Sequence, residues 1–388
     1  MKLAKSLERL GTESAFTVLA EAKKLEAQGK PMIHLGLGQP DFKTPKHVVE
    51  AAKKALDDGH HGYVMSNGIP ECRQAVTRWI KKRYNVDVDF ERILIMPGGK
   101  PTMFFCILMF GAHNKEIMYP NPGFPIYESL INYTGAKPVP IKLKEELNFS
   151  FKADEVLERI NDQTSLIIIN SPGNPTGGVI PRKEIEKLVI GLEAYPNVTI
   201  LSDEIYSRLL YGKQKHTSFL EFPSIRSRLI VLNGWSKTYA MTGWRLGYSV
   251  WPNRLLEYAN RLCVNNHSCV NTASQFAGLA ALKGSQNVVD EMLLEFDKRR
   301  NFIVNALNKI PGISCKEPSG AFYVFPNIKN TGLSSQKAQD NFLELSGVAT
   351  IAGNSFGKMG EGFIRFSYAN SLENIEEAMV RITKLLLK

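Results

Sequence analysis

The sequence lacks any apolar run of about 18 residues, the length that a membrane-spanning helix requires. It is also poor in cysteine, and its five cysteines form no CxxC pair and show no metal-ligand spacing: Cys72, Cys106, Cys263, Cys269 and Cys315. We therefore expect no membrane anchor and no metal site. Scattered cysteines in odd number also favour free thiols in a reducing compartment, which we take to be the cytoplasm.

The chain has no internal repeat, low-complexity tract or long linker, and its amphipathic N-terminal segment, which carries Glu8 and Glu13, does not resemble a secretory signal. Its net charge of +10 raises the question of a nucleic-acid partner. Basic residues cluster at 78–83, but neither interleaved aromatic residues nor a known reading module accompanies them. A solvated basic surface that attracts small anions is the better interpretation, and we expect no nucleic-acid partner.

What the sequence does contain is a series of short apolar, β-branched runs between about residues 90 and 250. They lie at 93–96, 116–119, 166–169, 198–201 and 229–232. Continuous runs without polar alternation are typical of strands that are covered on both faces, and helices between them supply the crossovers. We therefore predict an α/β fold whose large domain is a mostly parallel sheet covered by helices.

The two ends of the chain show a different pattern. Residues 12–28 are predicted to form one helix that stops at Gly29, and after about residue 285 charged amphipathic helices alternate with short strands at 320–325 and 362–367. This pattern predicts a smaller α+β domain to which the N-terminal segment returns. The expected boundaries are 45–285 for the large domain, and 1–44 with 286–388 for the small one.

Each apolar run is followed by a polar or glycine-rich segment. These segments lie at 98–100, 121–124, 170–175, 202–206 and 234–237. Ligands bind beyond the carboxyl ends of the strands in sheets of this kind. We therefore expect the five segments to meet at one rim and to form a site there.

Lys237 is the most informative residue in these segments. A lysine in water has a pKa of about 10.4, and burial or a nearby cation lowers that pKa and frees the amine to attack an aldehyde. Arg245, a few residues later, can supply such a cation and can also bind a phosphate. A lone lysine after a strand is more often a solvated surface residue, so the case depends on the surrounding segments.

Three strings in these segments carry a resemblance to a known family. They are NPTGG at 174–178, SDEIY at 202–206 and SKTYAMTGWRLGY at 236–248. With them the chain resembles the class I, fold-type I aminotransferases that depend on pyridoxal phosphate, and the similarity extends from residue 36 to Arg365. The resemblance implies pyridoxal 5'-phosphate as the cofactor, with Lys237, Asp203 and Tyr206 as catalytic residues.

The resemblance assigns the cofactor ring to residues that suit its chemistry. Lys237 forms a Schiff base with the cofactor aldehyde, and Asp203 keeps the pyridine nitrogen protonated so that the ring can accept electrons. Tyr206 and Asn174 donate hydrogen bonds to the ring's phenolic oxygen, and Phe124 stacks on the ring. Taken singly, Asp203 would be a helix cap, Asn174 a turn residue and Phe124 a core side chain.

The cofactor phosphate is assigned to an amide nest and a guanidinium. Gly99 and Lys100 precede an apolar helix whose free amides suit an anion, Arg245 offers two donors, and Ser236 adds a hydroxyl. Gly234 stands where some relatives have a phosphate-binding serine, which leaves that contact open. Tyr63 matches a tyrosine that relatives lend to the phosphate of the neighbouring subunit, so a homodimer is expected.

The substrate carboxylate calls for a planar pair of donors, which arginine provides. Arg365 lies among apolar residues that would make an unpaired guanidinium costly, and the resemblance assigns it to this carboxylate together with Gly38 and Asn174. A buried structural ion pair is the alternative for Arg365.

The predicted activity is amino-group transfer between an L-amino acid and a 2-oxo acid in ping-pong fashion. Lys237 would move a proton between the α-carbon and the former aldehyde carbon. No arginine lies at 265–271, and Leu108 and Met109 stand where some bacterial aspartate enzymes have a lysine. We therefore expect a neutral, alanine-like or broad donor range, with 2-oxoglutarate or pyruvate as acceptor. Candidate pocket residues are Ala15, Phe16, Phe124 and His267, although His267 suits a structural role as well.

Other activities on the same scaffold stay open from sequence. A C–S or β-lyase and an amino-acid oxidase share the lysine, aspartate and arginine and differ only in later steps. A regulatory module that binds the cofactor without turnover is a more remote alternative, because such modules carry a fused DNA-binding domain.

Overall fold

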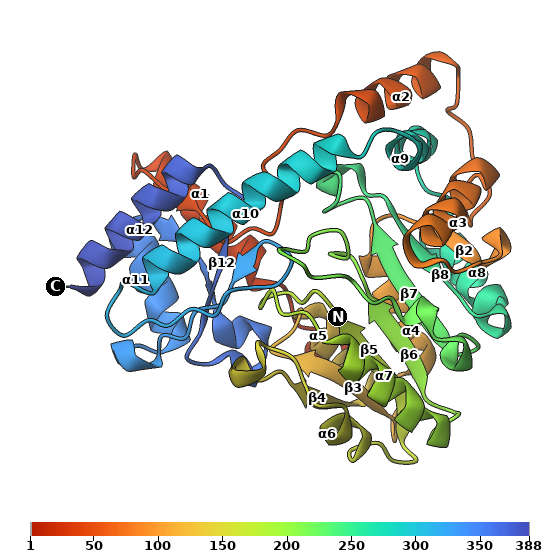
Figure 1. Cartoon of the computed structure of the whole chain (residues 1–388). Helices are drawn as coiled ribbons and strands as arrows, with labels where there is room; N and C mark the ends of the chain where they lie inside the picture. Colours follow the sequence, from red (N-terminus) through yellow and green to blue (C-terminus); the bar gives the residue numbers. More distant parts are fainter. Residues whose placement is uncertain (1, 388) are drawn as a thin grey trace.

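A computed structural model describes residues 2–387, and its centre is a sheet of seven strands (Figure 1). The strand order is β2-β8-β7-β6-β5-β3-β4, and every pair is parallel except the two that involve β8. The strands are β2 (Ile93–Met96), β3 (Glu116–Asn121), β4 (Lys137–Lys142), β5 (Thr164–Asn170), β6 (Thr199–Asp203), β7 (Leu229–Gly234) and β8 (Gly247–Val250). The predicted mostly parallel sheet is confirmed.

The five apolar runs became β2, β3, β5, β6 and β7, whereas β4 and β8 were not predicted. β4 is an edge strand that is partly open to solvent and contains Pro138 and Pro140, which an edge tolerates because one side makes no ladder bonds. β8 has the sequence Gly-Tyr-Ser-Val and therefore shows no apolar run, although it lies between β2 and β7. Its place in the sheet comes from its neighbours and not from its composition.

The runs are continuous because helices cover both faces of the sheet. Alternate residues such as Ile93 and Ile95 pack with α3 (Pro70–Tyr84), α7 (Arg182–Gly191) and α9 (Thr272–Lys283). Leu94 and Met96, between them, pack on the other face with α4 (Lys100–Phe110), α5 (Ile126–Thr134) and α8 (Asn253–His267). Each strand residue is thus withdrawn from water on one face or the other.

A smaller α+β part joins the two ends of the chain. β1 (Ile33–His34) pairs with β10 (Val348–Ala349), and β12 (Ile364–Ser367) lies between β11 (Ile351–Ala352) and β9 (Tyr323–Val324). In Figure 1, the red helix α1 (Ser14–Ala27) lies beside the blue C-terminal helices α11 (Ser335–Ser346) and α12 (Leu372–Leu386). The strand expected at 320–325 is shorter because Ala321 has a left-handed φ of 58°.

The long helix α10 (Asn287–Leu307) runs from the α9 side of the molecule to the smaller part (Figure 1). α2 (Lys46–Asp57) packs against α9, and the short α6 (Ala153–Leu157) packs against α7. We propose that the large domain spans 45–285 and the small domain 1–44 with 286–388. The strands of the two parts fall on either side of these boundaries.

Candidate active site

One cavity of about 560 Å³ opens at the carboxyl ends of the parallel strands. Its wall includes residues from the segments that follow β2, β3, β5, β6 and β7, which the sequence analysis expected to meet. All residues predicted to act in catalysis or to bind the cofactor or the substrate carboxylate, except Tyr63, line it: Gly38, Gly99, Lys100, Phe124, Asn174, Asp203, Tyr206, Ser236, Lys237, Arg245 and Arg365. The fold therefore brings together residues that are far apart in the chain.

Lys237 lies just beyond the end of β7 and lines the cavity. Its Nζ donates a hydrogen bond to the backbone oxygen of Gly38. Burial, together with the positive charges of Arg365 and Arg245, lowers the pKa of Lys237 to about 8, although Glu13 opposes this shift. About a tenth of the amine is therefore neutral at pH 7 and able to attack a carbonyl carbon.

Asp203 is the last residue of β6 and is only 2% exposed. Burial raises its pKa to about 6, against hydrogen bonds from the Tyr127 hydroxyl at 2.6 Å and the Ile205 amide at 3.2 Å that favour the ionised form. No salt bridge reaches this carboxylate within residues 2–387. A protonated ring nitrogen would supply the missing cationic partner.

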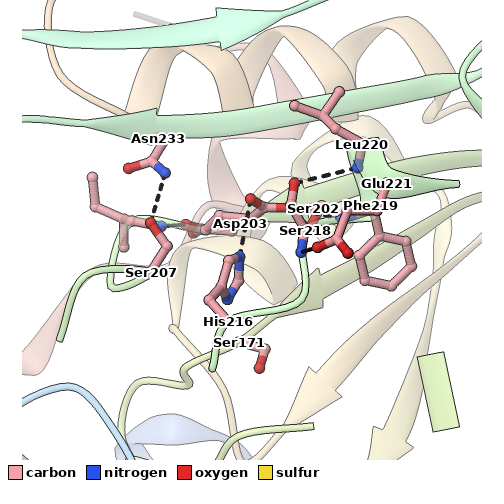
Figure 2. A network of polar contacts seen from close by, with 12 residues as sticks. Ser171, Ser202, Asp203, Ser207, His216, Ser218, Phe219, Leu220, Glu221 and Asn233 are labelled. Carbon is pink, nitrogen blue, oxygen red and sulfur yellow. Dashed lines mark hydrogen bonds and ion pairs between the residues drawn. The ribbon is translucent and has the colours of Figure 1, made fainter. Parts of the chain in front are cut away.

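A polar network behind Asp203 holds the loop that follows β6 (Figure 2). One carboxylate oxygen of Glu204 accepts hydrogen bonds from the hydroxyls of Ser202 and Ser218, each at 3.0 Å. The other oxygen lies 3.0 Å from Nε2 of His216, and both side chains of this pair are almost fully buried. Since Glu204 directly follows Asp203, the network restrains the position of the Asp203 carboxylate.

The start of α4 forms an anion cradle with Arg245. Gly98 has a φ of 83°, and a Cβ there would lie 2.2 Å from Nη2 of Arg245, so only glycine lets the guanidinium approach so closely. Gly99 and Lys100, at the N-terminus of α4, line the cavity, and the free amides of a helix start favour an anion. Gly234 is also confined, since a Cβ there would lie 2.9 Å from the Gly247 Cα, which leaves no room for a serine.

Arg365 lies in β12 and is only 3% exposed. Its Nη1 donates to the side-chain oxygen of Asn174 at 2.8 Å, and its Nη2 donates to the backbone oxygen of Gly36. The central carbon of the guanidinium, Cζ, lies 4.6 Å from the centre of the Tyr323 ring. Within the described residues 2–387, its Nε has no hydrogen-bond partner and no carboxylate forms an ion pair with the guanidinium. A buried cation of this kind suits the carboxylate of a small ligand.

Sequence reasoning missed several residues that line the cavity, among them Glu13, Tyr127 and Tyr323. The Tyr323 hydroxyl lies 2.8 Å from that of Tyr206, and a Cβ at Gly38 would lie 2.1 Å from it. Glycine at 38 is thus required by a tyrosine 285 positions later, and no local pattern could have indicated this contact.

Two other candidate residues lie outside the cavity wall. His267 stacks on Phe105 with ring centres 6.4 Å apart, and Ala15 is buried in α1, whereas Phe16 and Phe124 do line the cavity. The sequence predicts no second cation in the helix after Gly99, because Leu108 and Met109 stand where some relatives have a lysine. The structure has one at the first residue of that helix, Lys100, which lines the cavity.

The comparisons with known proteins agree with this geometry. The family model of class I and II aminotransferases matches residues 30–382. The chain belongs to this family. The aminotransferase is 42% identical to an aspartate aminotransferase of Pyrococcus horikoshii, over 92% of this chain and 90% of that protein. It is 38% identical to aromatic-amino-acid aminotransferase 2 of Thermococcus litoralis, over 93% of each chain.

The solved structures include an alanine aminotransferase from Pyrococcus furiosus. It is 32% identical to this aminotransferase, with a TM-score of 0.92 over the whole of both chains. The aminotransferase is a fold-type I transaminase, and its cofactor is pyridoxal 5'-phosphate. The cavity residues fit this cofactor, since an anion cradle, a buried carboxylate and an amine of lowered pKa line the same cavity.

Residues 2–387 include no helix with the length and apolar character that a membrane span needs. No group of three or more histidine, cysteine, aspartate or glutamate side chains in that range could hold a metal ion.

Proposed function

We propose that this aminotransferase exchanges an amino group between an L-amino acid and a 2-oxo acid by a ping-pong mechanism. We further propose neutral, alanine-like or broad donor specificity, with 2-oxoglutarate or pyruvate as acceptor. The observation that carries the proposal is the meeting of Lys237, Asp203 and Arg365 around one cavity. The similar proteins are named for aspartate, aromatic amino acids and alanine, a spread that supports a broad range.

The cofactor supplies an electron sink when it is bound. Lys237, whose pKa is lowered to about 8, would take a proton from the substrate α-carbon and return it to the former aldehyde carbon of the cofactor, on the other side of the amino nitrogen. Asp203 holds the proton on the ring nitrogen, and Arg365 with Asn174 and Gly38 binds the α-carboxylate. The remaining proposed contacts are Tyr206 and Asn174 to the phenolic oxygen, Phe124 to the ring face, and the backbone amides of Gly99 and Lys100 with the side chains of Ser236 and Arg245 to the phosphate.

We also propose that the active unit is a cytoplasmic homodimer. Tyr63 is 91% exposed, outside the cavity of its own chain, which suits a side chain that reaches the phosphate of a neighbouring subunit. All five cysteines are free, and four of them are buried, as expected of a protein from a reducing compartment.

Replacing Lys237 by alanine tests the assignment. The wild type with alanine, 2-oxoglutarate and the cofactor should form pyruvate and glutamate, and Lys237→Ala should form neither. The control Lys82→Ala, at an exposed position of α3, should keep full activity. Near-normal turnover by Lys237→Ala would rule out the assignment.

A substrate screen then tests the specificity. The loss of the bound cofactor's absorbance is followed with twenty amino acids, one at a time, and neutral amino acids should react well. Pyruvate and ammonia without a new amino acid would indicate a lyase, and oxygen uptake would indicate an oxidase.

A further inference from the structure

The segment before α1 forms part of the cavity wall. Its short helix η1 (Lys5–Arg9) is fastened to α5, where Nε of Arg9 donates to the Asn132 oxygen at 2.7 Å and the Gly11 amide donates to the Ser129 hydroxyl at 2.9 Å. These contacts place Glu13, the residue before α1, in the lining of the cavity. An acidic group therefore enters a site that binds anions.

Glu13 is paired with Lys100 across the cavity. The two side chains form an ion pair of 2.7 Å and are 20% and 48% exposed, respectively. The Lys100 amine also lies 5.6 Å from the ring centre of Phe124 and 5.7 Å from that of Phe16. The pair thus lies beside two aromatic side chains of the cavity wall.

Besides Lys237, which donates to the Gly38 oxygen, the cavity has three basic side chains, and these have different partners. The Arg365 guanidinium is buried without an acid in residues 2–387, and the Arg245 guanidinium lies against Gly98 at the start of α4. Among these side chains, only Lys100 is paired with a carboxylate from residues 2–387. Because the pair is partly exposed, solvent weakens it, and another carboxylate can take the place of Glu13 at little cost.

We propose that Glu13 is a specificity-determining residue, an internal carboxylate that occupies Lys100 beside a neutral substrate and is displaced by a substrate's second carboxylate. This inference rests on the proposed function and gives its broad specificity a structural basis. The neutral side chain of a substrate lies beside the Glu13–Lys100 ion pair, which has no net charge. The acidic side chain of a substrate can form an ion pair with Lys100, but it must first displace Glu13. The carboxylate of Glu13 therefore weakens the binding of dicarboxylic substrates without excluding them.

Binding of unreactive acids to the holoenzyme tests the proposal. Succinate carries two carboxylates and butyrate one on the same four-carbon chain, and calorimetry gives the dissociation constant of each. Glu13→Gln removes the competing charge and should tighten succinate binding about fivefold, the worth of a partly exposed ion pair, with butyrate binding unchanged. The control Glu8→Gln removes the same charge from an exposed position in η1 and should leave both constants unchanged.

Two further measurements complete the test. In Glu13→Gln/Lys100→Met the gain in succinate affinity should disappear, because the cation is gone. The ratio of kcat/KM for glutamate to that for alanine should rise about fivefold in Glu13→Gln. Unchanged or weaker succinate binding in Glu13→Gln, an equal gain in Glu8→Gln, or no succinate binding by any protein would overturn the proposal. If the wild type showed no transamination, the proposed function would be refuted instead, and the binding constants would still test the role of Glu13.

Discussion

Replacing Asp203 by asparagine should stabilise the cofactor-free protein, although it removes the partner of the cofactor's ring nitrogen. Burial raises the pKa of Asp203 from 3.8 to about 6 in the folded chain. The folded protein therefore holds this proton more tightly than the unfolded chain does. As pH rises from about 4 to 6, the unfolded chain loses the proton first, so the free energy of unfolding decreases over this range and stays lower above it.

The size of the effect follows from the pKa difference. A shift of about two units corresponds to about 3 kcal/mol at pH 8, where the buried carboxylate is ionised. Asparagine has the same shape and no charge, but its amide cannot accept both hydrogen bonds, from Tyr127 and Ile205, as a carboxylate does. That mismatch costs about 1 kcal/mol, which leaves an expected net gain of about 2 kcal/mol for Asp203→Asn.

Urea unfolding of the cofactor-free proteins at pH 8 and pH 4 measures this gain. The variant should be more stable than the wild type at pH 8, and the difference should disappear near pH 4. With pyridoxal phosphate present the order should reverse, because the wild type binds the cofactor more tightly and gains its binding energy. Asp162→Asn, at an exposed turn before β5, is the matched control and should change stability by less than about 0.5 kcal/mol.

The reasoning is refuted if the wild type is the more stable protein at pH 8 without cofactor. It is also refuted if the stability difference is the same at both pH values, because the charge of Asp203 then contributes nothing.

Three further predictions concern the rest of the cavity. Gly98→Ala should weaken cofactor binding at least tenfold in an equilibrium titration. The new Cβ displaces the Arg245 guanidinium, and the left-handed φ costs about 1–2 kcal/mol for alanine. Unchanged affinity would show that Arg245 does not hold the phosphate. Tyr323→Phe should lower the free energy of unfolding by about 1–2 kcal/mol, since the buried Tyr206 hydroxyl loses its partner, and chemical denaturation measures this change. The rate at which the cofactor-free chain reacts with pyridoxal phosphate should rise with pH, with a midpoint near pH 8. The reason is that burial lowers the pKa of Lys237 and only the neutral amine attacks. Stopped-flow measurements test this, and a midpoint near pH 10.5 would contradict the burial of that amine.

The sheet was predictable where both of its faces are covered. Runs such as those of β5 and β7 are apolar at every position because one residue faces one set of helices and the next faces the other. β8 and β4 were missed because a glycine-containing central strand and a proline-containing edge strand carry no such pattern. Both β4 and β8 form because they pair with neighbouring strands, and this pairing is a property of the tertiary structure.

The cavity was predictable to a similar degree. Motif residues such as Lys237 and Asp203 lie directly after strands, so the parallel sheet itself gathers them. Tyr127 and Tyr323 come from elements whose local sequence says nothing about the site, although they form hydrogen bonds with Asp203 and Tyr206.

The sequence by itself determined the class of fold and the chemical groups that are available, because hydrophobic pattern and motif are local properties of the chain. Only the tertiary structure decided how those groups behave. Burial sets the pKa values of Asp203 and Lys237, and the pairing of Glu13 with Lys100 joins residues 87 positions apart. Removal from water and proximity between charges depend on distances in space, which the order of residues does not contain.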